Sequence, residues 1–277
     1  MYNIHMKKFL SVVLCAIVAF SLCGCFEKQR VSTSIFGVWW WNNDLDQSYL
    51  DFAVSNNINE IYFCDENFEN TQFVLDATQK GIDVYWLIGE KEWLLDMTKL
   101  EEKVDSYIQF NNANDNIYSG IHLDIEPHQF DDFDQNRQQY IYNLIDLANT
   151  LDKKYPNIFF DYDIPFWLDD SITYNNITKP AYAHMIDVAD CVFLMSYRDS
   201  ATAMLDVSKE EIEYATSVNK QVVLGAETSA SSETEIVTYY EEGKNYMNQQ
   251  LEIVKQKLPD KFGVSIHHMK SWRDLKE

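Results

Sequence analysis

The chain has 277 residues and is acidic, with 44 Asp and Glu against 22 Lys and Arg and a formal net charge of −22 at pH 7. This charge argues against nucleic acid and anionic lipid headgroups as ligands, because both would be repelled. Aromatic residues make up 14% of the chain, which suits a neutral partner with flat apolar faces.

The N-terminal segment has the pattern of an export signal. Two lysines precede an apolar run that is too short to span a bilayer comfortably. The following sequence LCGC, which ends at Cys25, resembles the lipobox of bacterial lipoproteins, and an ordinary secretory signal is the alternative. The lipobox resemblance implies a signal peptide over 1–25, a lipid on Cys25 and a polar tether over 26–34. We therefore expect an extracytoplasmic protein of the bacterial cell envelope, anchored to a membrane through this lipid.

From residue 34 onward, short apolar runs alternate with longer amphipathic stretches. The runs predict strands at 34–40, 58–64, 82–88, 118–125, 158–164, 190–196, 220–226 and 262–268. Helical patterns lie between them, for example at 71–81, 140–155, 209–219 and 246–258. Eight such repeats predict an α/β fold, a single (β/α)8 TIM barrel over 35–277, in preference to an open doubly wound sheet. No Gly-x-Gly-x-x-Gly turn follows a predicted strand, so nothing indicates a dinucleotide cofactor.

Polar and aromatic residues gather where the predicted strands end. The carboxyl ends of the strands of a TIM barrel meet at one face, and active sites lie there. The residues expected to bind the substrate are Trp40, His122, Asp163, Trp167, Arg198, Asp199, His267 and Trp272. A mouth lined with carboxylates and tryptophans is typical of a carbohydrate site, because acids cleave the acetal and indoles stack on sugar rings.

The stretch GIHLDIEPH, residues 120–128, carries the acid pair on which the functional prediction depends. Strand alternation places His122, Asp124 and Glu126 on one face, with the Cα atoms of residues i and i+2 roughly 6.5–7 Å apart. Two carboxyl groups this close repel each other when both are ionised, so one can remain a proton donor near neutral pH. Glu126 at the rim is the predicted general acid of a glycosidase, and Asp124 is the deeper partner that tunes it.

Two motifs of the chain resemble those of the chitinase-like family 18 glycoside hydrolases. The strand 4 motif of that family, Asp-x-x-Asp-x-Asp-x-Glu, falls on four residues of which the last two match: Ser119, His122, Asp124 and Glu126. The Met-x-Tyr of its strand 6 is matched at residues 195–197, which end in Tyr197. Trp272 is the candidate for the tryptophan that forms the floor of the sugar pocket after strand 8.

The resemblance also implies a mechanism. The nucleophile would be the 2-acetamido oxygen of the substrate itself, which is a recognised exception to the two-carboxylate scheme. Asp124 would orient the acetamide N–H, Tyr197 would hold its carbonyl group, and Glu126 would protonate the departing sugar. The substrate is then a poly- or oligosaccharide that contains N-acetylhexosamine, and the enzyme needs no cofactor.

Three alternatives stay open at the level of sequence. Glu126 and Glu227 end strands 4 and 7, where retaining glycosidases of clan A carry their acid/base and nucleophile; a carboxyl separation of about 5–5.5 Å would support this reading. The strand 4 residues together with His267 or His268 offer ligands for a divalent metal, as in a metal-dependent hydrolase or deacetylase. The third alternative is a non-catalytic carbohydrate-binding lipoprotein. Our prediction is a monomeric glycosidase without a bound metal.

Overall fold

The computed structural model describes residues 34–41, 47–232 and 234–277. The predicted signal peptide, the lipidation site Cys25 and residues 26–33 of the predicted tether lie outside the described residues. Within the described part, no helix is both long enough and apolar enough to cross a bilayer.

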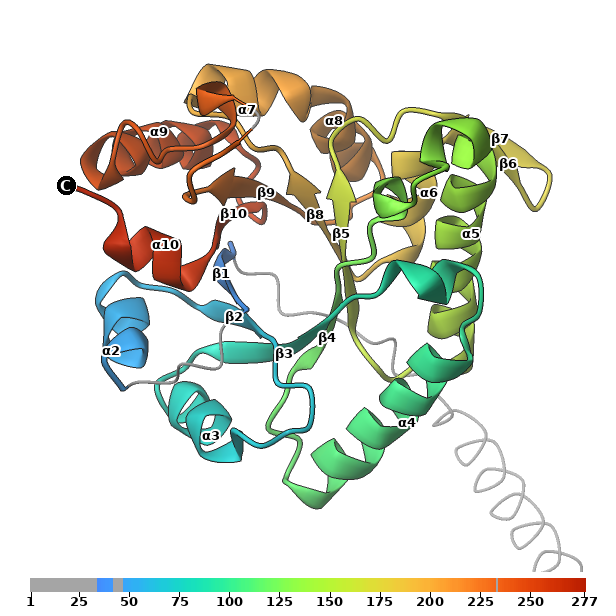
Figure 1. Ribbon diagram of the computed structural model, residues 1–277, viewed down its shortest axis with the longest axis horizontal. Helices are drawn as coiled ribbons and strands as arrows, with labels where there is room; N and C mark the ends of the chain where they lie inside the picture. Colours follow the sequence, from blue (N-terminus) through green and yellow to red (C-terminus); the bar gives the residue numbers. More distant parts are fainter. Residues whose placement is uncertain (1–33, 42–46, 233) are drawn as a thin grey trace, which may run out of the picture.

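Eight parallel strands close into a barrel, and helices surround it (Figure 1). The order around the barrel is β1-β10-β9-β8-β5-β4-β3-β2. The strands are β1 (Phe36–Trp40), β2 (Glu60–Phe63), β3 (Asp83–Ile88), β4 (Gly120–Leu123), β5 (Phe160–Pro165), β8 (Cys191–Met195), β9 (Val222–Glu227) and β10 (Gly263–His267). Each overlaps one of the eight predicted strands, which confirms the single TIM barrel.

The outer layer of helices packs through amphipathic faces. The helices are α2 (Gln47–Ser55), α3 (Thr71–Gln79), α4 (Thr98–Ala113), α5 (Phe133–Lys154), α6 (Ala181–Val188), α7 (Ala201–Val207), α8 (Lys209–Ser217), α9 (Lys244–Lys257) and α10 (Met269–Asp274). In α5, for example, Leu144, Ala148 and Leu151 recur at intervals of three and four residues, and all three are buried. Such stripes turn toward the strands and bury the outer face of the barrel.

The inside of the barrel is filled largely by aromatic side chains. A separate core cluster consists of Ile35, Trp39, Tyr62, Tyr85, Leu87, Cys191, Phe193 and Val223. The ring of Tyr62 lies 5.2 Å from that of Trp39 and 4.7 Å from that of Phe193. Gly37 makes room for this packing, because a Cβ atom there would lie 2.3 Å from the Tyr62 hydroxyl. The barrel is therefore a packed core below its mouth, as expected for this fold.

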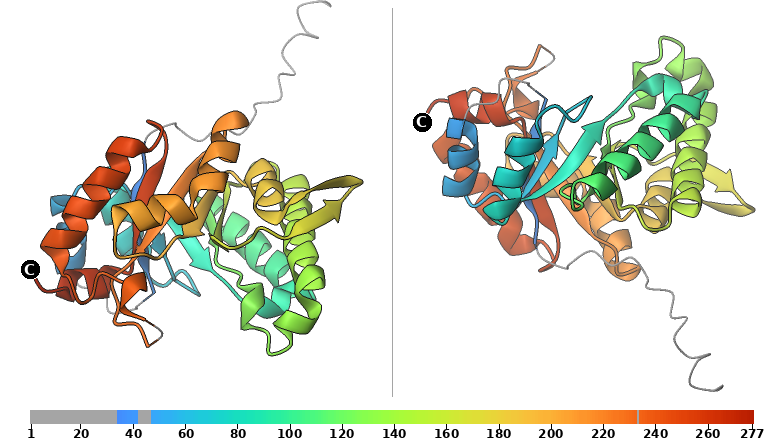
Figure 2. Two further views of the ribbon diagram at one scale, coloured as in Figure 1. Left: turned by 90° about the horizontal axis from the view of Figure 1, so that it is seen from above. Right: turned by 90° about the horizontal axis from the view of Figure 1, so that it is seen from below.

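An antiparallel hairpin between β5 and α6 was not predicted. It consists of β6 (Ser171–Tyr174) and β7 (Ile177–Pro180) and projects from the barrel beside α5 and α6 (Figure 2). Asn175 and Asn176 form its two-residue loop with φ values of 49° and 65°. Two consecutive positive φ angles are typical of a type I′ turn, for which asparagine is well suited.

Candidate active site

A cavity of about 440 Å³ opens at the carboxyl ends of the strands. The described residues that line it are Trp41, Gly89, Glu90, Lys91, Glu92, Asp124, Glu126 and Gln129. Its volume lies in the range of small-ligand sites, roughly 300–1,000 Å³. Asp124 and Glu126 therefore face one shared hollow, as their spacing on strand 4 predicted.

Glu126 forms the rim of this cavity. It directly precedes a short 3₁₀ turn, Pro127–Gln129, whose proline fixes the backbone where the strand ends. The Gln129 amide donates a hydrogen bond to its Oε2, and the His128 Nε2 atom lies 3.9 Å from its Oε1. With 19% of its side chain exposed, Glu126 can reach a ligand in the cavity.

Asp124 is half-buried, and its neighbour on β5 is the buried acid Asp163. The β4–β5 register ends with the pair Leu123 and Tyr162, and Asp124 and Asp163 are the next residues along the two segments. Each has a buried Oδ1 atom without a hydrogen-bond partner among the described residues. Burial raises the pKa of Asp124 well above its ordinary value, and the carboxylates of Asp163 and Glu126 raise it further. Asp124 thus has a strong tendency to hold a proton.

The backbone of β3 leaves room for Asp124. Gly89 follows β3, and a Cβ atom at this position would lie 1.8 Å from the backbone oxygen of Asp124. Any larger residue would push the two strand ends apart. Glycine therefore sets how closely the end of β4 approaches β3, and with it the position of Asp124.

His122 and Trp39 contact the carboxyl group of Asp163 inside the barrel. Its Oδ2 atom lies 2.8 Å from His122 Nε2 and accepts a hydrogen bond of 3.0 Å from Trp39 Nε1. Burial raises the pKa of Asp163 well above its ordinary value, although the Trp39 hydrogen bond opposes this shift. His122 is 0% exposed and stacks on Tyr62 at 4.2 Å. The predicted direct contact of His122 with the substrate is therefore wrong: the imidazole supports Asp163 from inside the barrel.

Tyr197 lies among the acids of the site. Burial raises the pKa of its phenol, and the nearby carboxylates, above all that of Glu227, raise it further. The hydroxyl therefore keeps its proton and can donate a hydrogen bond to a ligand. Gly225 on β9 makes room for its ring, because a Cβ atom there would lie 3.0 Å from Tyr197 Cε1.

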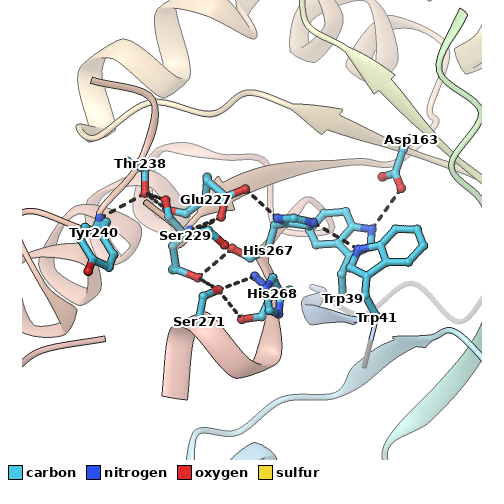
Figure 3. A network of polar contacts seen from close by, with 11 residues as sticks. Trp39, Trp41, Asp163, Glu227, Ser229, Thr238, Tyr240, His267, His268 and Ser271 are labelled. Atoms are coloured by element: carbon cyan, nitrogen blue, oxygen red, sulfur yellow. Dashed lines mark hydrogen bonds and ion pairs between the residues drawn. The ribbon is translucent and has the colours of Figure 1, made fainter. Parts of the chain in front are cut away.

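Glu227 and His267 form a hydrogen-bonded pair across β9 and β10 (Figure 3). The Glu227 Oε1 atom accepts the backbone N–H groups of Thr228 and Ser229 at 2.7 and 2.6 Å, and its Oε2 atom lies 2.6 Å from His267 Nδ1. Burial alone would raise the pKa of Glu227, but the bonds to His267 and Ser229 outweigh it and lower the pKa. Glu227 is thus an ionised carboxylate with both oxygens engaged, which disfavours its role as a nucleophile.

The remaining predicted residues of the mouth lie around the rim. Trp167 is half-buried, stacks under the guanidinium of Arg137 at 4.7 Å and lies 5.5 Å from the ring of His128. Arg198 donates to the backbone oxygen of Tyr197 at 2.7 Å and lies 4.6 Å from the ring of Phe166. The backbone N–H of Asp199 donates to Ile236 at 3.0 Å, which ties this rim segment to the loop after β9.

Two tryptophans predicted to bind the substrate are core residues instead. Trp40 is 2% exposed and packs outside the barrel, 5.1 Å from the ring of Tyr49 and 5.0 Å from that of Phe73. Trp272 is 1% exposed and packs 4.8 Å from the ring of Phe52. Neither offers a face to a sugar ring, so both predictions are wrong.

Trp39 and Trp41 are the residues that the sequence analysis missed. Side chains alternate along β1, so Trp39 and the residue two positions later turn inward when Trp40 turns outward. Trp39 reaches Asp163, and Trp41 lines the cavity. The alternation of strand 1 was the signal that could have separated these three neighbours.

A metal site does not form where the sequence offered ligands. In the part of the chain that the structure describes, no group of three or more His, Cys, Asp or Glu residues is arranged to hold a metal ion. His122 and His267 each direct a ring nitrogen toward a carboxylate, Asp163 and Glu227 respectively. The metal-dependent alternative therefore finds no ligand set in this region.

Comparisons with known proteins bear on the fold. No family profile and no curated protein matches the sequence. Among solved structures, a chitinase from Bacteroides thetaiotaomicron has a TM-score of 0.54 at 13% identity, covering 86% of this chain and 90% of that one. A GH18 chitinase from Cycas revoluta in complex with (GlcNAc)3 has a TM-score of 0.50 at 12% identity, covering 87% of this chain and 96% of that one. At these identities the likeness shows that the chain has the barrel fold of these chitinases.

Proposed function

We propose that the protein is a glycoside hydrolase that cleaves an N-acetylhexosamine-containing poly- or oligosaccharide. The observation that carries this proposal is the shared cavity with Glu126 at its rim and the half-buried Asp124 beside it. Glu126 acts as general acid/base, and Asp124 is its partner. The fold adds support, because the similar Cycas revoluta barrel is a chitinase with (GlcNAc)3 bound.

The unpartnered oxygen of Asp124 suggests how the acetamide is held. Asp124 lines the cavity, and one oxygen of its carboxyl group has no hydrogen-bond partner among the described residues, so this group favours a ligand with a hydrogen-bond donor. The acetamide N–H of the substrate is such a donor. The Tyr197 hydroxyl then donates to the acetamide carbonyl, whose oxygen turns toward the anomeric carbon.

The reaction proceeds in two balanced steps. The acetamide oxygen attacks the anomeric carbon while the bond to the leaving oxygen breaks, and Glu126 gives its proton to that oxygen. The Glu126 carboxylate then takes a proton from water, whose oxygen attacks the anomeric carbon as the acetamide oxygen departs. The carboxyl group of Asp124 accepts the acetamide N–H, which becomes a stronger donor as positive charge develops on the acetamide.

The same fold supports a proposal for the orientation at a membrane. Ser34 donates a hydrogen bond to the backbone oxygen of Phe262 at 2.7 Å, so the chain enters β1 at the amino end of the barrel, opposite the cavity. A lipid on Cys25, as the LCGC sequence implies, would then leave the cavity facing away from the membrane. The tether of 26–34 would reach at most roughly 30 Å.

The test of the proposed function compares Glu126→Gln with the wild-type protein on soluble GlcNAc oligomers. We expect turnover to fall by about 10²–10⁴-fold while oligosaccharide binding stays, because the amide cannot donate the catalytic proton. Glu66→Gln is the matched control, since Glu66 follows β2 and its side chain is 77% exposed. Unchanged turnover in Glu126→Gln refutes the assignment, and binding without turnover in the wild type indicates a carbohydrate-binding protein. Cleavage of sugars that lack the acetamido group refutes the acetamide mechanism.

A further inference from the structure

Among the described lining residues, Trp41 brings the one large apolar surface into the cavity. The other described lining residues are a glycine, charged residues and a glutamine: Gly89, Glu90, Lys91, Glu92, Asp124, Glu126 and Gln129. Trp39 and Trp40 are each 2% exposed, whereas Trp41 is half-buried. A flat indole next to two candidate catalytic acids is suited to pack against the apolar face of a sugar ring.

A chain of hydrogen bonds fixes the orientation of this indole. The Trp41 Nε1–H group donates to His267 Nε2 at 3.1 Å, and His267 Nδ1 lies 2.6 Å from Glu227 Oε2. An indole nitrogen only donates, so His267 Nε2 must be unprotonated, and His267 Nδ1 carries the proton that is donated to Glu227. In Figure 3 the His267 ring lies between Glu227 and the indole of Trp41. The two backbone N–H groups on the other oxygen of Glu227 anchor the far end of the chain.

The hydrogen-bond chain depends on the protonation state of His267. A protonated imidazole would point an N–H group at the N–H of Trp41 and break the contact. Burial lowers the pKa of His267, but the bond to Glu227 outweighs it and raises the pKa overall, so the neutral imidazole that accepts from Trp41 predominates only above this raised pKa. The charged or aromatic groups that face this imidazole from the neighbouring segments are Trp39, Trp41, Asp124, Asp163, Tyr197, Glu227 and His268.

We propose that Trp41 is the platform on which the sugar ring packs, and that His267 and Glu227 are positioning residues that hold its indole in the cavity. This inference rests on the proposed function and names how the same site holds its substrate. It also gives Glu227 a role other than that of a nucleophile, since its carboxylate acts on the substrate only through His267 and Trp41.

The platform is tested by binding of GlcNAc tetramer, measured by calorimetry. We expect Trp41→Ala to weaken binding about 10-fold or more, and Trp41→Phe, which keeps a flat ring, to weaken it less. Tyr142→Ala is the control, because Tyr142 is a 37% exposed aromatic on the outer helix α5. Binding by Trp41→Ala equal to that of the wild type overturns the platform.

The positioning role is tested by the indole N–H resonance of Trp41, assigned through its loss in Trp41→Phe. We expect this resonance to shift in His267→Ala and Glu227→Gln, and to shift with pH in the wild type as His267 is protonated. We also expect both variants to raise KM more than they lower kcat. If Glu227→Gln is folded and the indole N–H resonance of Trp41 does not shift, the proposed hydrogen-bond chain is wrong.

These outcomes separate the inference from the function on which it rests. Wild-type hydrolysis together with unchanged binding by Trp41→Ala keeps the glycosidase and removes the platform. If the wild-type protein binds GlcNAc oligomers without hydrolysing them, and Trp41→Ala loses this binding, the platform is supported and the glycosidase is refuted. A wild-type protein that neither binds nor cleaves GlcNAc oligomers overturns both.

Discussion

The substitution Asp163→Asn probes the pair of Asp124 and Asp163 most sharply. The side-chain oxygen of the introduced asparagine can still accept from Trp39 and face His122, where Asp163 Oδ2 lies now. The amide group would replace the Oδ1 atom, which is buried and has no hydrogen-bond partner among the described residues. It would then donate toward Asp124, whose own buried Oδ1 also lacks a partner in this region. One change thus gives both atoms a hydrogen-bond partner and introduces no charge.

The expected magnitude follows from these two atoms. An unsatisfied buried polar atom costs about 1–3 kcal/mol, and the substitution satisfies two such atoms. Trp39 and His122 then contact a neutral amide oxygen, which is a weaker acceptor than a carboxylate. We therefore expect a net gain of about 1–3 kcal/mol in the free energy of unfolding at pH 7. Because Asp163 contributes to the raised pKa of Asp124, the substitution lowers this pKa toward its ordinary value. Turnover should fall, since a lower pKa changes the protonation of the Asp124 carboxyl group that faces the acetamide.

The raised pKa of Asp124 determines whether the free energy of unfolding rises or falls with pH. Burial and the neighbouring acids raise the pKa of Asp124 in the folded protein, so the folded state binds this proton more tightly than the unfolded chain. The stability it contributes is present below the ordinary pKa of Asp and is lost as the pH rises toward the raised value. Urea denaturation across this window should show a shallower loss in Asp163→Asn than in the wild type. A free energy of unfolding lower in Asp163→Asn than in the wild type at pH 7 would show that the asparagine does not give the two unpartnered atoms a hydrogen bond.

Three further substitutions test the support by Glu227, the packing of Trp40 and the close approach at Gly89. Glu227→Gln should lower kcat/KM by about 10–100-fold in steady-state assays, which is less than the loss in Glu126→Gln, because Glu227 supports His267 and is not the nucleophile. If azide restores activity to Glu227→Ala, Glu227 is the nucleophile and this prediction is wrong. Trp40→Ala should lower the free energy of unfolding by about 3–5 kcal/mol and leave KM unchanged, as thermal unfolding and kinetics can show. Gly89→Ala should destabilise the fold and abolish turnover, because its Cβ atom would lie 1.8 Å from the backbone of Asp124; a fully active, stable variant would refute the close approach.

The barrel could be predicted from the sequence because each strand is a local pattern. Apolar runs such as 82–88 and 220–226 needed no knowledge of their neighbours, and the structure places a strand at each. The position of Asp124 and Glu126 in one cavity also followed from the spacing of i and i+2 on a strand that ends at the mouth.

The contacts that cross between strands could not be predicted in the same way. The contact between His122 and Asp163 depends on the β4–β5 register, which no local pattern of residues specifies. Trp272 was misplaced because α10 is a short helix after the last strand, and the face that it buries is decided by its packing against Phe52. The hairpin was missed although Asn175 and Asn176 form a typical turn sequence.

The roles of Glu126 and Asp124 are tested by a crystal structure of the Glu126→Gln variant with a bound GlcNAc tetramer. We predict that the glycosidic oxygen lies within hydrogen-bond distance of the side chain at position 126, and that an acetamide N–H donates to the carboxyl group of Asp124. An oligosaccharide bound away from both residues, or an acetamide group without contact to Asp124, would contradict these roles.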